Sequence, residues 1–174
     1  MYMKSNIALI CLFNNYSRNV SKVLGDKLDM FYVDVEDMLD FELGNIEHIK
    51  QTLGEKEGAN YIKKCENRVV DNVCDFENTI ITIDPIVLFE KKNFEKISQK
   101  CFIVYLQISP KFFASRAKSS RDNIPDDILG IAFAERDKQY VDNSDIVLDC
   151  SKLKEAKAAK KIVGEIIKHF KNQQ

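Results

Sequence analysis

The stretch that decides the fold of this chain reads Ile7-Ala8-Leu9-Ile10-Cys11-Leu12-Phe13-Asn14-Asn15-Tyr16-Ser17-Arg18-Asn19-Val20. Residues 6–13 form a nearly continuous apolar run, which is typical of a strand buried on both faces of a sheet. Asn14-Asn15 predicts a turn, and the apolar spacing after Val20 predicts a helix that starts near Ser17. A strand, a turn and a helix in this order predict a βα unit of the nucleotide-binding kind.

The turn in this unit lacks the residues that usually hold phosphate. A phosphate-binding loop has the pattern G-x-x-x-x-G-K-[ST], in which glycines expose backbone N–H groups, lysine neutralises charge and the hydroxyl binds Mg²⁺. These four positions are occupied here by Cys11, Tyr16, Ser17 and Arg18. Ser17 is expected to cap the helix, with a contribution to nucleotide binding as the alternative.

Arg18 follows the lysine position of the pattern by one residue. A helix rotates by about 100° per residue, so the Arg18 side chain is expected to point away from a bound phosphate. A surface arginine is therefore the favoured interpretation, and an arginine that restores contact with a nucleotide phosphate is the alternative.

The composition predicts one domain, residues 1–174, without a nucleic-acid or membrane partner. Of the 174 residues, 45% are hydrophobic, which is enough for a sizeable core, and the net charge of −1 gives no attraction to polyanions. The N-terminus lacks a signal-peptide layout, and no apolar run approaches the length of a membrane span. These features predict a cytoplasmic protein.

The cysteine pattern predicts free thiols rather than a metal site. The five cysteines are odd in number and lack C-x-x-C spacing, and the chain has only two histidines. Cys11 and Cys101 lie in apolar runs and are expected to be buried thiols of a reduced protein.

Beyond residue 28, strands alternate with helices. Further strands are predicted at residues 30–33, 79–83, 101–107 and 146–148. Helices are predicted at residues 35–43, 46–53, 55–74 and from Ser151 onward, and Ser109-Pro110 predicts another helix start. This alternation predicts an α/β protein with three layers, in which helices cover both faces of a five-stranded parallel sheet.

The last predicted helix has one apolar face and one lysine-rich face. The apolar positions are Leu153, Ala156, Ala159, Val163, Ile166 and Phe170. The lysines on the other side are interpreted as a solvated face, in preference to a basic binding surface.

Four motifs, in order and at consistent spacing, resemble those of the shikimate kinases over nearly the whole chain. Residues 32–36 (Tyr-Val-Asp-Val-Glu) are similar to F-x-D-x-D, and residues 58–66 are similar to G-E-x-x-F-R-x-x-E. Residues 104–116 resemble V-Y-L-x-x-S-P-x-x-L-x-x-R, and residues 136–145 resemble R-x-P-L-Y-x-E-x-A-D. The resemblance implies a P-loop kinase fold with strand order 2-3-1-4-5 and residues 6–13 in the central strand.

The resemblance also implies roles for four residues on the acceptor side. Glu36, Lys63 and Arg136 match the family's substrate-binding positions, and Asp34 matches the residue that helps to hold Mg²⁺ and to activate the hydroxyl. Lys63 replaces an arginine and loses its two-pronged contact with a carboxylate. The alternative interpretation is a cluster of ion pairs without a ligand.

Two further elements of the family are changed. The glycines that normally follow the third strand are replaced by Ile83-Asp84-Pro85, and Pro85 cannot donate a backbone N–H. The lid corresponds to a short segment at about residues 117–127, in which Arg121 is the residue that could supply charge to a transition state. An exposed loop arginine is the alternative there.

These features leave three hypotheses. The favoured one is a degenerate shikimate-kinase-like protein without phosphotransferase activity or cofactor, which binds a small anionic metabolite or a partner protein in the old acceptor cleft. The second is an active kinase that uses Mg²⁺ and ATP to phosphorylate shikimate or a similar hydroxylated acceptor. The third is a structural or regulatory subunit without a ligand. The residues at 16–18 argue against the second hypothesis, and the retained Asp34, Glu36 and Arg136 argue against the third.

Overall fold

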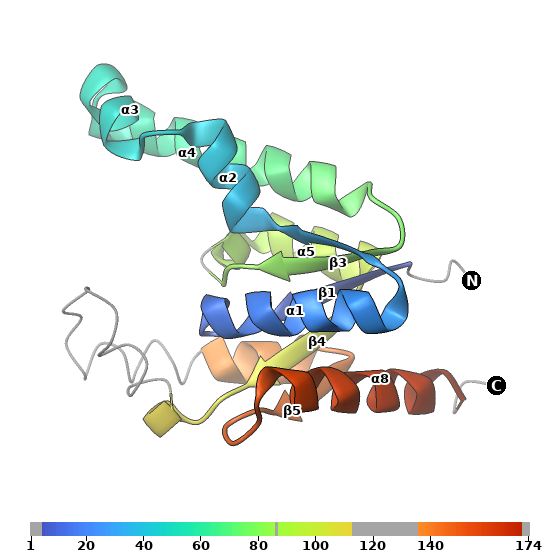
Figure 1. Cartoon of the computed structure of the whole chain (residues 1–174). Coiled ribbons are helices and arrows are strands. Elements are labelled where there is room, and N and C mark those ends of the chain that lie inside the picture. Colours follow the sequence, from blue (N-terminus) through green and yellow to red (C-terminus); the bar gives the residue numbers. More distant parts are fainter. Residues whose placement is uncertain (1–4, 86, 113–135, 172–174) are drawn as a thin grey trace.

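The structure of the protein is a computed structural model that describes residues 5–85, 87–112 and 136–171 (Figure 1). Its sheet consists of β1 (Asn6–Ile10), β2 (Phe31–Asp34), β3 (Thr79–Ile83), β4 (Cys101–Gln107) and β5 (Ile146–Asp149). The strands are parallel and lie in the order β2-β3-β1-β4-β5. This confirms the predicted fold class and strand order. The lid expected at about residues 117–127, including Arg121, lies outside the described residues.

β1 is the central strand, and its sequence explains why. It pairs with β3 on one side and with β4 on the other, and all five of its residues are buried. Ile7 and Leu9 belong to the core on one face of the sheet, whereas Ala8 and Ile10 belong to the core on the other face. A strand covered on both faces needs apolar residues, as the sequence predicted, and the exception Asn6 is satisfied by a hydrogen bond from the Thr79 N–H to its Oδ1 at 3.1 Å.

Helices cover both faces of the sheet. They are α1 (Asn14–Leu28), α2 (Val35–Leu43), α3 (Ile46–Leu53), α4 (Glu55–Cys74), α5 (Lys91–Lys100) and α8 (Glu155–Lys171), with a 3-10 turn η1 (Val87–Phe89) and a helical stretch over residues 136–143. The core on the Leu9 face is closed by α1 and α8, and the core on the Ile10 face is closed by α4 and α5. α3 packs on α4 and extends past the sheet (Figure 1). None of the helices in these described ranges is long and apolar enough to cross a membrane.

Several predicted boundaries differ from the observed ones. α2, α3 and α4 have the predicted bounds, but β1 ends at Ile10 rather than residue 13, and α1 begins at Asn14 rather than near Ser17. The last helix begins at Glu155 rather than Ser151, because residues 151–152 form a turn. α5 was not predicted from the sequence; its buried residues are Asn93 and Ile97.

The apolar face predicted for the last helix is correct in part. Ala159 is buried there, together with Ala158 and Ile162, while Val163, Ile166 and Phe170 pack against this core. Ala156 is exposed, contrary to the prediction. The lysines lie on the exposed side. All five cysteines are buried and free, which confirms the expectation for Cys11 and Cys101.

Candidate functional site

The connection between β1 and α1 occupies the place of a phosphate-binding loop. It consists of residues 11–13, and Phe13 is the N-cap of α1 without a side-chain capping bond. The backbone N–H groups of Tyr16 and Ser17 both donate to the Phe13 carbonyl oxygen, at 3.0 and 3.5 Å. The prediction that Ser17 caps α1 is therefore wrong, because Ser17 lies buried inside the first turn. The amides of these two motif positions are already bonded within the helix.

The side chains of Cys11 and Tyr16 belong to the core. The Cys11 thiol accepts a weak hydrogen bond from the Phe13 N–H at 3.4 Å, and burial raises the pKa of Cys11 to about 12. Tyr16 is 4% exposed, and its hydroxyl donates to the Leu153 carbonyl oxygen at 3.0 Å. Its ring also meets the Phe112 ring edge-on. The aromatic side chain that replaces a loop glycine thus fastens α1 to the segment before α8.

Arg18 extends from α1 to the carboxyl end of β2. Its Nε lies 2.9 Å from Asp34 Oδ2, and its Nη2 lies 3.1 Å from Glu36 Oε2 and 3.1 Å from Asp37 Oδ1. The hydrogen bond to Asp34 raises the pKa of Arg18. The expectation of a plain surface arginine is wrong, because the side chain is only 25% exposed and contacts three carboxylates. We call Arg18, Asp34, Glu36 and Asp37 the Arg18 cluster.

Asp34 is the buried centre of the Arg18 cluster. Its Oδ1 accepts the backbone N–H groups of Glu36 and Asp37 at 2.9 and 3.3 Å, so that Asp34 caps α2. Its Oδ2 accepts the Arg18 Nε–H and, at 3.3 Å, the hydroxyl of Tyr32. A carboxylate offers about four acceptor positions, so the hydrogen-bonding capacity of Asp34 is used within the protein.

Lys63 belongs to a second group of charges, at the end of β3. It projects from α4 and forms an ion pair with Glu90. Burial raises the pKa of nearby Glu66, Lys63 opposes this shift, and Asp84 and Glu90 reinforce it. Lys63 therefore interacts with two carboxylates, that of Glu90 through the ion pair and that of Glu66 on its own helix.

Arg136 belongs to the same region. It opens the described part of the helical stretch over residues 136–143 and is half-buried. Burial raises the pKa of Tyr140 to about 12, with Arg136 opposing this shift and Asp84 adding to it. Asp84 acts electrostatically on both Tyr140 and Glu66, and these two side chains are in turn influenced by Arg136 and Lys63 respectively. Asp34 ends β2 and Asp84 follows the neighbouring strand β3, so both residues lie at the edge where open α/β sheets bind ligands.

A hydrogen-bond network that was not predicted from the sequence fixes the position of Arg136. The adjacent Asp137 accepts a hydrogen bond from the Tyr105 hydroxyl at 2.8 Å and from Gln107 Nε2 at 3.0 Å. Both partners lie on β4, so they fasten the helical stretch to the carboxyl end of this strand. Tyr105 and Gln107 carry hydrogen-bonding groups on the last three residues of a strand that is otherwise apolar, and these polar groups were the available signal in the sequence.

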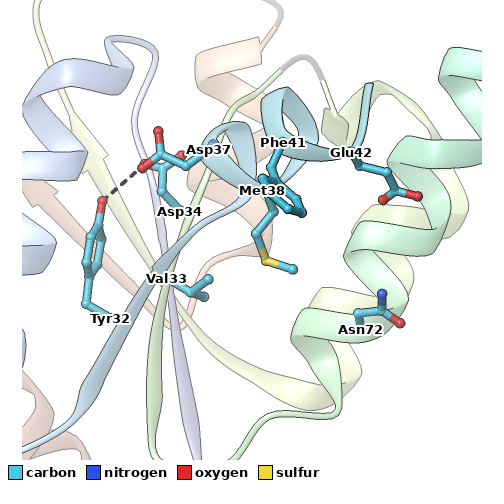
Figure 2. A pocket seen from close by; sticks show the side chains of 8 residues that line it. All are labelled: Tyr32, Val33, Asp34, Asp37, Met38, Phe41, Glu42 and Asn72. Atoms are coloured by element: carbon cyan, nitrogen blue, oxygen red, sulfur yellow. Dashed lines mark hydrogen bonds between the residues drawn. The ribbon is translucent and has the colours of Figure 1, made fainter. Parts of the chain in front are cut away.

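A pocket of about 560 Å³ borders the Arg18 cluster, between β2, α2 and α4 (Figure 2). Its lining residues are Tyr32, Val33, Asp34, Asp37, Met38, Phe41, Glu42 and Asn72. Figure 2 shows Met38 and Phe41 projecting from α2 over Val33 of β2. Among the described residues that were predicted as site residues, Asp34 alone lines this pocket. The pocket is therefore separate from the position of Lys63 and Arg136.

The fold and the placement of charged side chains at its strand ends define an α/β protein of the P-loop kinase class. The sequence profile described as shikimate kinase matches residues 18–168, which is most of the chain. The chain belongs to the shikimate kinase family. The match begins at Arg18, so the β1–α1 connection lies outside it.

Individual relatives agree with this assignment. A shikimate kinase of Dehalococcoides mccartyi is 28% identical over 120 residues, which cover 68% of this chain and 66% of the relative. A shikimate kinase of Caldicellulosiruptor saccharolyticus is 26% identical over 115 residues, covering 65% and 64%. The matched region thus spans slightly less than two thirds of these relatives.

Solved structures show the same fold. The shikimate kinase from Acinetobacter baumannii in complex with shikimate has a TM-score of 0.79 at 19% identity, covering 94% of this chain and 93% of that one. The shikimate kinase from Aquifex aeolicus has a TM-score of 0.75 at 22% identity, covering 92% and 95%.

The residues of this chain do not fit Mg²⁺ and nucleotide phosphate in the manner implied by the resemblance. Asp34, the residue that matches the metal-holding position, already makes four hydrogen bonds inside the protein. Within the described ranges, no group of three or more His, Cys, Asp or Glu side chains is arranged to hold a metal ion. The amides of Tyr16 and Ser17 are likewise engaged.

Proposed function

We propose that this member of the shikimate kinase family does not transfer phosphate and uses its former acceptor cleft for binding. The observation that carries this proposal is the β1–α1 connection. Its motif positions are committed to the helix and the core: the amides of Tyr16 and Ser17 bond to the Phe13 carbonyl, and the Tyr16 ring is buried. A phosphate cradle at this place would require breaking these contacts.

The expected effect on nucleotide affinity is large. Phosphate-binding loops offer converging backbone donors and a lysine, and charge-assisted hydrogen bonds contribute about 1.5–3 kcal/mol each. The loss of the lysine and of two donors costs about 5 kcal/mol, or about a 4,000-fold loss of affinity. Micromolar binding of Mg-ATP would become millimolar.

The ligand proposed for the cleft is a small anionic metabolite or a partner protein. Lys63 and Arg136 act on Glu66 and Tyr140, the two side chains that Asp84 also influences, and this supports an anion site at the end of β3. Lys63 contacts Glu90, so an anion would bind there by displacing this carboxylate. A carboxylate on the ligand is the simplest group that makes this exchange, since it replaces one carboxylate by another at the same ammonium group.

The test combines two measurements on the unmodified protein. Calorimetric titration with Mg-ATP should show no saturable binding below millimolar concentration. A coupled assay with shikimate and Mg-ATP should show no turnover, with an active shikimate kinase as the positive control. Binding of Mg-ATP below about 100 µM, or turnover that is abolished in Asp34→Asn, would contradict the proposal.

The alternative function is an active ATP-dependent kinase for shikimate or a similar hydroxylated acceptor. The observation that favours it is the similarity to curated shikimate kinases, at 28% identity over 120 residues. Under this alternative, Arg18 or Ser17 would contact the nucleotide and Asp34 would hold Mg²⁺. The coupled assay decides between the two functions.

A further inference from the structure

We propose that Arg18 is a built-in counter-cation that occupies the metal position at the end of β2 and closes it against divalent cations. This inference rests on the proposed function, because a protein that transferred phosphate at this cleft would need the cation position open. The inference assigns a role to Arg18 and explains why the carboxylates at the end of β2 are retained. These carboxylates bind a side chain of the protein instead of a metal.

The geometry of the Arg18 cluster carries the inference. The guanidinium uses two of its nitrogens to contact three carboxylates, with N–O distances of 2.9, 3.1 and 3.1 Å. Asp34 is the buried member, whereas Glu36 and Asp37 are 46% and 63% exposed and lie at the rim. The planar guanidinium is always charged and its fork of donors matches carboxylate oxygens, so it is well suited to this place.

The helix that carries Arg18 is itself held in position. The Thr82 hydroxyl donates to Ser21 Oγ at 2.6 Å, and both side chains are fully buried between β3 and α1. Ser21 follows Arg18 by three residues, so the two lie on neighbouring positions of the same helix surface. The base of the Arg18 side chain is therefore fixed beside β3, next to the strand that ends in Asp34.

A divalent cation could bind at Asp34 only by displacing hydrogen bonds that Asp34 already makes within the protein. It would need an oxygen of Asp34, but both oxygens already accept two hydrogen bonds each. Mg²⁺ loses its water ligands reluctantly and requires near-ideal octahedral geometry. The negative charge left over after pairing with Arg18 lies on the two exposed rim carboxylates, where water and salt screen it.

The test measures binding of Mn²⁺ alone, by electron paramagnetic resonance, without nucleotide or shikimate. Arg18→Met should bind Mn²⁺ at least about tenfold more tightly than the unmodified protein, because Asp34, Glu36 and Asp37 lose their cation. As these side chains stand they are not arranged to hold a metal ion, so the gain requires the exposed Glu36 and Asp37 side chains to turn toward the bound cation. The second substitution Asp34→Asn in this background should abolish the gain. Mg²⁺ should compete for the uncovered site.

Arg68→Met is the matched control. Arg68 pairs with Glu42, a carboxylate that lines the neighbouring pocket, so this variant removes one positive charge near the same region but leaves the Arg18 cluster intact. It should bind Mn²⁺ like the unmodified protein. If Arg18→Met does not fold, Arg18→Gln takes its place, since its amide can still donate to Asp34.

Three outcomes would overturn the inference. The unmodified protein binds Mn²⁺ as tightly as the Arg18 variants do, or Arg68→Met gains as much affinity, or none of the variants gains any. Phosphate transfer by the unmodified protein would contradict the proposed function and, with it, this inference. Mn²⁺ binding by the unmodified protein without turnover would contradict this inference alone.

Discussion

At the scale of single residues, Asp34 shows how a position that matches a ligand-binding residue of the family can serve the fold. It caps α2 through two backbone N–H groups and holds Arg18 through its other oxygen. Both roles depend on burial, because a carboxylate withdrawn from water is stable only when its acceptor positions are filled. The presence of Asp34 is therefore explained by structure alone, without a bound metal.

Replacing Asp34 by alanine should lower the free energy of unfolding by about 2–4 kcal/mol, since it removes an N-cap and leaves the partly buried Arg18 without its main partner. Urea denaturation measures this loss. Asp37→Ala is the control, because Asp37 is 63% exposed and contacts the same guanidinium. It should cost less than about 1 kcal/mol. Equal losses in the two variants would show that burial of Asp34 is not what matters.

At the scale of elements, the close packing of α3 on α4 depends on a glycine. A Cβ atom at Gly58 of α4 would lie 3.0 Å from Lys50 Cα of α3, which is backbone and cannot rotate away. α3 itself has no buried residue, so its position depends on this contact with α4. Gly164 of α8 is the opposite case, since a Cβ atom there would have nothing within 4 Å.

The same substitution at these two glycines should have opposite effects. Gly164→Ala should raise the free energy of unfolding by about 0.5–1 kcal/mol, because alanine favours the helix and meets no neighbour. Gly58→Ala should lower it by about 0.5–2 kcal/mol, because overpacking outweighs the gain in helix propensity. Urea denaturation gives the signs, and amide hydrogen exchange should show lost protection in α3. If Gly58→Ala instead raised the free energy of unfolding, α3 could shift away from α4 without loss of stability, and the expectation would be wrong.

At the scale of the whole molecule, three tyrosines (Tyr16, Tyr105 and Tyr140) are buried in the two cores, and a fourth, Tyr32, is half-buried beside Asp34. Burial raises the pKa of Tyr16, Tyr32, Tyr105 and Tyr140 above the ordinary value of 10.0, to about 12 for Tyr32 and Tyr140. Each phenol is neutral in the folded protein at a pH where it would ionise in the unfolded chain. The folded state therefore binds more protons than the unfolded state above pH 10.

Below pH 10, the free energy of unfolding should keep its full contribution from these tyrosines. It should fall as the pH rises from 10 to 12. Each buried tyrosine contributes a slope of up to about 1.4 kcal/mol per pH unit. Urea denaturation across this range, with tyrosinate absorbance as a second readout, tests the expectation. Tyr140→Phe keeps the buried ring but removes the ionisable hydroxyl. The free energy of unfolding of this variant should therefore fall less steeply with pH, by the contribution of one tyrosine. Stability that stays constant through this range would contradict the linkage.

The sequence by itself determined the fold. The apolar runs and helical spacings predicted β3, β4, α2, α3 and α4 with their observed bounds, because these segments have strong periodicity and clear flanking signals. α5 was missed because its sequence carries only two apolar residues, Phe94 and Ile97. The order of the strands followed from the family resemblance, and the central place of β1 agreed with the two-sided apolar character of residues 6–13.

Only the tertiary structure decided the partners of the charged side chains. Helix geometry predicted that Arg18 turns away from a phosphate, but not that it contacts carboxylates at the end of β2, 16 to 19 positions later in the chain. Asp137 meets Tyr105 from 32 positions away, and Lys63 meets Glu90 on a separate segment. Periodic patterns record which face of an element is buried, since burial repeats along the chain. An ion pair between distant residues leaves no such repeat, because it depends on where the packed elements place two side chains.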